Sequence, residues 1–117
     1  MAAVTELRLE RASRTLHVAF DDGESFALPA EYLRVASPSA EVQGHSPDQR
    51  VLVAGKRGVA IVGIEPVGNY AVRLIFDDRH DTGIYSWEYL REMGEQQQAR
   101  MATYEAELAS RGLSRDR

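Results

Sequence analysis

The sequence contains no cysteine at all. Disulfide bonds, thiolate nucleophiles and every zinc or iron–sulfur site built on cysteine are therefore excluded. Long apolar runs are missing as well. No stretch approaches the roughly 20 apolar residues that a membrane-spanning helix needs, and residues 1–13 lack the continuous apolar core of a signal peptide. We therefore expect a cytoplasmic protein that does not bind membranes.

Positive charge is also scarce, with 14 basic residues against 18 acidic ones and a formal net charge of −4. Such a field repels phosphate backbones, so nucleic acid is not expected as a partner. Proline is limited to 4 residues and hydrophobic residues make up 44% of the chain, which is typical of ordinary globular proteins. A chain of 117 residues suits one hydrophobic core, so we expect a single domain, residues 1–117.

Alternating apolar residues in the first third of the chain predict β-strands, because side chains on a half-buried strand face the core at every second position. The predicted strands cover residues 4–9, 14–20 and 24–28. Between the last two, Asp22-Gly23 is a favoured dipeptide for a tight hairpin turn. After Pro29, residues 30–35 could form one or two helical turns, because proline is compatible with a helix start.

Residues 36–50 have loop composition and are predicted to lie on the surface, where only Val42 is expected to pack. A second block of strands follows. The predicted strands cover residues 51–53, 59–65, 70–76 and 83–85. The density of valine and isoleucine makes 59–65 the expected central strand, and the short connection 66–69 indicates an antiparallel hairpin.

Two helices are predicted in the last third. Ser86 suits the N-cap of a helix that ends at Gly94, and a second helix follows. Its buried stripe is expected to hold Met101, Tyr104 and Leu108. Glu107 and Arg111 have the spacing of a surface ion pair, and the residues after Gly112 are expected to fray. The predicted fold is α+β: a small antiparallel β-sheet domain with a short helix after strand three and one or two C-terminal helices.

Acidic residues and a histidine gather in the segment 77-DDRHD-81. Carboxylates and imidazole are ligands that iron, manganese and zinc accept, so His80, Asp78 and Asp81 are the candidate metal ligands, with Asp77 and His45 as additions. However, neighbours on one turn rarely converge on a single ion. Sequence of this kind between a strand and a helix is also typical of a solvated turn, and both interpretations stay open.

Three aromatic residues, Tyr85, Trp87 and Tyr89, follow this segment closely. Clustered aromatics can anchor a protein interface, so they are the candidate partner-binding residues. Packing in the core of a small domain is the commoner reason for such a cluster. A small sheet also has exposed edges that could pair with a second copy, which makes a homodimer a further option.

No complete catalytic motif is present. The segment 44-GHSPD-48 is similar to the nucleophile elbow G-x-S-x-G, but Asp48 replaces the final glycine. Gly63 and Gly68 are spaced as in a phosphate-binding loop, yet Asn and Tyr at 69–70 stand where Lys and Ser/Thr are required. Because no nucleophile, base and orienting group can be named together, the sequence predicts no enzyme.

Three segments are similar to one known family. They are 20-FDDG-23, 29-PAEYLRVASPSAEVQGH-45 and 63-GIEPVGNYAVRLIFDDRHDTGIYSWEYL-90, and the specific motif is His80-Asp81-x-Gly83-Ile84-Tyr85-Ser86-Trp87. On these residues the chain resembles the gamma-butyrobetaine hydroxylase-like N-terminal domain family over nearly its whole length. The resemblance implies an accessory module, because this family occurs as small stand-alone bacterial proteins, as an N-terminal module on 2-oxoglutarate-dependent carnitine-pathway hydroxylases, and fused to P-loop scaffold ATPases of iron–sulfur assembly.

In the hydroxylases of this family the module holds a zinc ion through three cysteines and one histidine. The resemblance therefore implies a zinc site at the matching positions. Here Ser37, Ser39 and Val42 stand at the cysteine positions, and His80 stands at the histidine position. Serine hydroxyls are poor zinc ligands beside thiolates and valine is none, so we expect no closed zinc site. His80 would then serve the turn through a hydrogen bond to Asp81 or Ser37.

The resemblance and the missing chemistry together predict a non-catalytic accessory module that needs no cofactor and binds a protein partner. An iron–sulfur assembly factor or an iron-dependent oxygenase pathway is the implied context. The alternative is a protein that binds iron or zinc through His80 and the nearby carboxylates.

Overall fold

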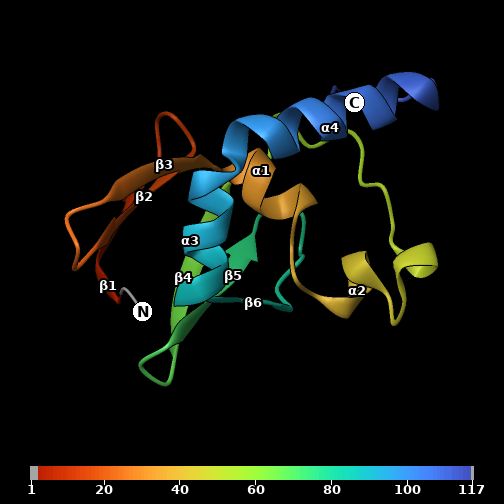
Figure 1. Ribbon diagram of the computed structural model, residues 1–117. Helices are drawn as coiled ribbons and strands as arrows, with labels where there is room; N and C mark the ends of the chain where they lie inside the picture. The colour runs from red at the N-terminus through yellow and green to blue at the C-terminus, as the bar shows by residue number, and fades with distance from the viewer. Residues whose placement is uncertain (1–2, 117) are drawn as a thin grey trace.

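The computed structural model describes residues 3–116 as an α+β fold with two three-stranded antiparallel sheets (Figure 1). The strands are β1 (Val4–Glu10), β2 (Thr15–Phe20), β3 (Ser25–Pro29), β4 (Ile61–Val67), β5 (Ala71–Phe76) and β6 (Gly83–Ser86). The helices are α1 (Ala30–Val35), α2 (Ala40–Gln43), the 3-10 turn η1 (Pro47–Gln49), α3 (Trp87–Glu95) and α4 (Gln97–Ser110). The fold class, the helix after strand three and the two C-terminal helices are confirmed. Over residues 3–116, no helix combines the length and the apolar character needed to cross a membrane.

The first sheet has the order β1-β2-β3, with β2 in the centre. Its core face alternates as predicted: Leu16, Val18 and Phe20 are buried, and Leu16 pairs with Leu28 on β3. The turn between β2 and β3 depends on Gly23, whose φ of 91° is in the left-handed region that glycine tolerates. The hairpin predicted at Asp22-Gly23 is therefore confirmed.

The second sheet has the order β4-β5-β6, so β5 is the central strand. The prediction that 59–65 would be central is wrong, because β4 forms an edge of this sheet. Pro66 lies within β4 opposite Val72, and a residue without a backbone N–H is tolerated on an edge strand. Val62 is 49% exposed near an irregularity in the β4–β5 pairing. Residues 51–53, which were predicted as a strand, pair with no other strand.

The hydrophobic core lies between the two sheets and the helices. Helix α3 contacts both β3 of the first sheet and β6 of the second, so it joins the two halves. Leu33 on α1 and Leu90 and Met93 on α3 are fully buried there. Gly94 allows the Phe26 ring to lie directly on α3, since a Cβ at this position would come within 2.5 Å of the ring. The buried stripe predicted on α4 is confirmed by Tyr104 and Leu108, with Met101 partly buried.

The segment after α4 is docked against the rest of the chain. The backbone N–H of Gly55 donates to Ser114, and that of Arg57 donates to Arg115. The Arg115 guanidinium also binds both carboxylate oxygens of the buried Glu31, at 2.7 and 2.8 Å. Over residues 113–116 the prediction that this segment frays is therefore wrong, because long-range contacts hold it, while residue 117 lies outside the described residues.

The expected ion pair between Glu107 and Arg111 is also replaced by a long-range contact. Glu107 binds Arg50 at 2.6 Å, from the loop that runs alongside α4. Tyr104 makes a second link to the same loop through a hydrogen bond from its hydroxyl to the Val53 carbonyl. These contacts hold residues 50–53 against α4, although they form no strand.

Candidate functional site

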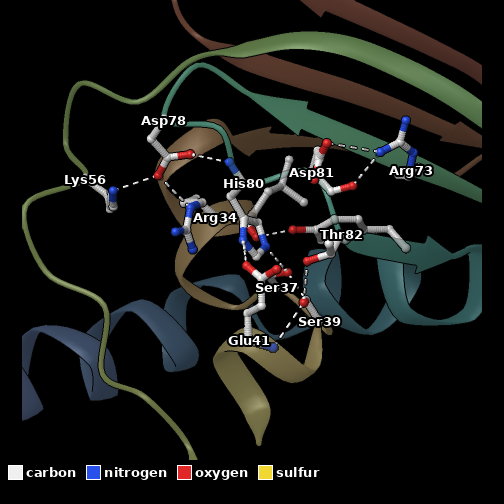
Figure 2. A network of polar contacts seen from close by, with 12 residues as sticks. Arg34, Ser37, Ser39, Glu41, Lys56, Arg73, Asp78, His80, Asp81 and Thr82 are labelled. Carbon is white, nitrogen blue, oxygen red and sulfur yellow. Dashed lines mark hydrogen bonds and ion pairs between the residues drawn. The ribbon is translucent and has the colours of Figure 1, made fainter.

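The turn between β5 and β6 meets the loop after α1 in a compact polar cluster (Figure 2). Arg79 takes a left-handed backbone conformation with φ of 72°, and this closes the turn so that Phe76 N–H donates to the His80 carbonyl at 3.0 Å. The backbone N–H of His80 donates to the Asp78 carboxylate at 3.1 Å. The turn therefore directs the His80 side chain inward, toward residues 37–41.

We name the five residues Ser37, Ser39, Glu41, His80 and Thr82 the His80 cluster. Ser37 Oγ lies 2.8 Å from His80 Nε2, and Glu41 Oε2 lies 3.2 Å from His80 Nδ1. Since a carboxylate can only accept, Nδ1 carries the proton and Nε2 accepts from the Ser37 hydroxyl. Ser39 Oγ and Thr82 Oγ1 are 2.6 Å apart.

Burial controls the ionisation of His80, whose side chain is only 2% exposed. Burial lowers the pKa of His80 below its ordinary value, and the positive charge of Arg34 lowers it further. Glu41 and Asp78 act in the opposite direction without reversing the shift. His80 is therefore held in its neutral form, which matches the hydrogen bonds that its two nitrogens make.

Ser37, His80 and Glu41 have the same order of contacts as a hydrolase triad: hydroxyl, imidazole and carboxylate. The sequence alone did not identify these three residues as a set, and the fold brings them together. However, Ser37 has no exposed surface, and its Oγ also accepts from Ser39 N–H at 3.2 Å. A Cβ on Gly83 would lie 2.6 Å from that oxygen, so the space above the serine is already filled. Ser37 is therefore enclosed in this structure, and the contacts of Ser37, His80 and Glu41 join the loop after α1 to the β5–β6 turn.

The cluster occupies the place where the family resemblance implies zinc, and its residues do not fit the metal. Ser37 and Ser39 offer hydroxyls that are already hydrogen-bonded, and Val42 offers a buried hydrocarbon side chain. The expected hydrogen bond from Ser37 to His80 is confirmed. The alternative bond to Asp81 is absent from the described residues, since the Asp81 carboxylate faces Arg73 at 3.5 Å.

The side chains of the three sequence-predicted metal ligands, His80, Asp78 and Asp81, bind different partners. Asp78 Oδ2 binds Arg34 Nε at 2.8 Å and Lys56 Nζ at 2.6 Å. Burial alone would raise the pKa of Asp78, but Lys56, Arg34 and the His80 N–H together lower it to about 2. In residues 3–116 no three His, Asp or Glu side chains are grouped so that they could hold a metal ion.

The two further candidates, Asp77 and His45, also lie outside any such group. Asp77 accepts from the Ala60 N–H, and the exposed His45 donates its backbone N–H to Gln49. The structure therefore does not bring His80, Asp78 and Asp81 together as ligands.

The aromatic candidates divide between core and surface. Tyr85 is fully buried, and its hydroxyl donates to the Leu33 carbonyl, so its assignment to a partner-binding surface is corrected: it is a core residue. Trp87 and Tyr89 are half-buried and pack against the core. Trp87 Nε1 donates to the Asn69 carbonyl at 2.8 Å, and the Tyr89 hydroxyl donates to the Ala36 carbonyl at 2.6 Å. Of the three, Tyr89 lines a hollow on the surface.

That hollow, which we name the α1–α4 groove, has a volume of about 660 Å³. This is within the range of about 300–1,000 Å³ common for ligand pockets. It is lined by Tyr32, Val35, Ala36, Pro38, Gln43, Arg50, Tyr89, Ala99, Arg100, Met101, Thr103, Tyr104 and Glu107. Sequence reasoning missed this groove. The available signal is that Arg100 directly precedes Met101 in the stripe of Met101, Tyr104 and Leu108, a stripe whose spacing by itself predicts core packing.

Comparisons with known proteins are consistent with this fold. A family model described as "Gamma-butyrobetaine hydroxylase-like, N-terminal" matches residues 7–91. A protein whose NMR solution structure is known shares 50% identity and a TM-score of 0.85, over 99% of this chain and 91% of its own. A crystal structure from Acidithiobacillus ferrooxidans, described as a protein of unknown function in the DUF971 family, shares 40% identity and a TM-score of 0.66, over 79% of this chain and 92% of its own. No curated protein matches the chain.

Proposed function

The chain belongs to the gamma-butyrobetaine hydroxylase-like N-terminal domain family, and from this premise we propose that it is a non-catalytic module that binds a protein partner. The partner classes follow from the family resemblance: a P-loop scaffold ATPase of iron–sulfur assembly, or an oxygenase of an iron-dependent pathway. In either setting the module would act by surface contact and would need no cofactor of its own.

One observation carries this proposal: the reactive-looking residues are sealed, whereas the α1–α4 groove is open. Ser37 and His80 are buried beneath the turn and engaged with each other. The groove presents Tyr89 and Met101, and aromatic and methionine side chains are enriched at protein interfaces. A surface of this kind favours recognition over catalysis.

The test uses two matched alanines on α4. Ala99 lines the groove, whereas Ala102 is also exposed on α4 and does not line it. The purified chain is titrated against the scaffold ATPase and against the oxygenase of the same organism by biolayer interferometry. We expect one of the two to bind. Ala99→Glu should weaken that binding by at least about tenfold, which corresponds to about 1.4 kcal/mol, and Ala102→Glu should leave it unchanged.

Two results would count against the proposal. If neither protein binds the wild-type chain, the partner-binding role in these pathways is wrong. If a partner binds but both glutamate variants bind it equally well, the groove is not the contact surface. Circular dichroism of both variants provides the folding control.

Metal binding through His80 is the second function that the sequence raised, and among residues 3–116 no group of ligands favours it. Both ring nitrogens of His80 are engaged, one with Ser37 and one with Glu41, so a metal would have to displace one of these partners. Elemental analysis of untagged protein tests this alternative directly. Stoichiometric zinc or iron that disappears in His80→Ala would establish it.

A further inference from the structure

The floor of the α1–α4 groove is apolar in character, although three tyrosines contribute to it. The Tyr32, Tyr89 and Tyr104 hydroxyls donate to the carbonyls of Met93, Ala36 and Val53 at 2.6–2.7 Å. Burial raises the pKa of Tyr32 and of Tyr104 to about 12, so these hydroxyls remain protonated donors at neutral pH. The half-buried Tyr89 ring therefore offers hydrocarbon surface to a ligand, whereas Tyr32 and Tyr104, 1% and 7% exposed, close the floor beneath it.

The rim of the groove is locally basic on an acidic protein. Arg50 and Arg100 line it with Glu107 as the one acidic residue, whereas the whole chain carries a formal charge of −4. The Arg50 and Arg100 side chains are 41% and 33% exposed, so a ligand can reach both. Arg100 lies 5.7 Å from the centre of the Tyr89 ring, which holds the guanidinium at the groove.

Both guanidiniums keep donors for a further carboxylate. Each guanidinium has five N–H donors. Within the described residues, Arg50 donates to Glu107, and Arg100 contacts Gln96, Glu92 and the Tyr89 hydroxyl. An incoming acidic group can therefore bind without breaking these contacts, and charge-assisted bonds of this type are stronger than neutral ones.

The length of the groove limits the size of the segment that it can hold. The lining residues of α4 run from Ala99 to Glu107, which is about 12 Å at 1.5 Å per residue. An extended chain covers this length with about four residues. Arg100 and the Arg50–Glu107 pair are separated by about 10 Å along the helix, near the two ends of such a segment.

We propose that the α1–α4 groove binds an acidic, apolar segment of the partner protein. Apolar side chains of about four extended residues lie on the half-buried Tyr89 and Met101, and flanking carboxylates reach Arg50 and Arg100. This inference rests on the proposed function and specifies the chemistry of the partner that the module recognises.

Three fluorescein-labelled peptides test it by fluorescence anisotropy. All three carry the same Leu-Phe-Leu centre, and their flanks are glutamate, glutamine or lysine. We expect the glutamate peptide to bind at least about fivefold more tightly than the glutamine peptide, and the lysine peptide to bind least. Raising the salt concentration from about 50 to 500 mM should weaken only the glutamate peptide, because screening acts on charged contacts.

Arginine variants locate the contact on the protein. Arg50→Gln and Arg100→Gln should each weaken the glutamate peptide by about three- to tenfold and leave the glutamine peptide unchanged. Arg111→Gln is the matched control, because Arg111 is exposed just after α4 and does not line the groove. It should change neither affinity.

Each other outcome overturns a defined part of the proposal. If the glutamate and glutamine peptides bind equally well, or the lysine peptide binds more tightly, the proposed preference for acidic segments is wrong. If neither arginine variant changes the binding of the glutamate peptide, the groove is not the binding site. If a partner protein binds and Ala99→Glu disrupts it while the peptides fail, this inference is wrong and the proposed function stands. If the peptides behave as expected and neither partner protein binds, the proposed function is wrong, but the proposal that the groove recognises acidic segments is supported.

Discussion

Replacing Asp78 by asparagine tests the electrostatic centre beside the His80 turn. The Asp78 side chain is 10% exposed and binds both Arg34 and Lys56. Arg34 is itself 12% exposed, and within the described residues its Nη1 is buried without a hydrogen-bond partner. The asparagine side chain would keep an oxygen for the His80 N–H but would lose the charge, so the isosteric change isolates the ion pairs.

The expected loss follows from the pKa of Asp78. A shift from the ordinary 3.8 to about 2 means that the folded state favours the carboxylate. At 1.36 kcal/mol per pKa unit, this is about 2–3 kcal/mol of stability at neutral pH. Removing one partner from a buried pair often costs about 3–5 kcal/mol, so the value worked from the pKa is a lower estimate.

Urea denaturation of wild type and Asp78→Asn between pH 7 and pH 2 measures both the loss and its origin. Because the folded pKa is lowered, the stabilisation is complete above the unfolded value near 4 and is lost as the pH falls toward about 2. The two proteins should therefore converge in acid. Asp116→Asn is the control, since Asp116 is 64% exposed in its pair with Arg57 and its loss should cost less than about 1 kcal/mol. A cost for Asp78→Asn no larger than for Asp116→Asn, or a difference that persists at pH 2, would refute this account.

Three further predictions concern packing and titration. Gly94→Ala should lower the free energy of unfolding by about 1–3 kcal/mol in urea denaturation, although alanine favours helices, because the new Cβ would collide with the Phe26 ring; unchanged or raised stability contradicts this packing. Ser37→Ala should cost about 1–3 kcal/mol in thermal melts, because the buried Nε2 of His80 loses its donor; a neutral result means that this hydrogen bond contributes nothing. Since burial lowers the pKa of His80, its stabilising effect is complete above the unfolded value near 6.5 and is lost as the pH falls below it; urea midpoints from pH 7.5 to 5 should decline more steeply in wild type than in His80→Gln, and equal slopes contradict this.

Strands and helices were predictable where the signal is local. The alternation in 14–20 placed β2 (Thr15–Phe20) to within one residue, and the Ser86 N-cap was placed correctly, with its Oγ accepting from Tyr89 N–H at 3.0 Å. The pairing of strands is a long-range property. Apolar density suggested 59–65 as the central strand, whereas Pro66 was the better indicator that this strand lies at an edge.

The polar site shows a second limit of sequence reasoning. Residues 36–50 look like a surface loop, and the prediction that only Val42 would pack there is wrong, because Ser37 and Ser39 are also buried. Their hydroxyls tolerate burial because His80 and Thr82, about 40 positions away in sequence, satisfy them. Only the family resemblance related Ser37 to His80, because residue composition does not reveal a contact between positions 43 apart in sequence.

The His80 cluster and the groove are connected by a short chain of contacts. His80 fixes Ser37 at 2.8 Å, and the Ser37 carbonyl accepts from the Gln43 side chain, also at 2.8 Å. Gln43 and Pro38 line the α1–α4 groove, so the wall of the groove is built from the loop that the His80 turn holds. The proposed partner binding would benefit from a rigid groove, since ordering a mobile wall on binding would reduce affinity. The buried triad-like arrangement therefore orders the loop that forms one wall of the α1–α4 groove.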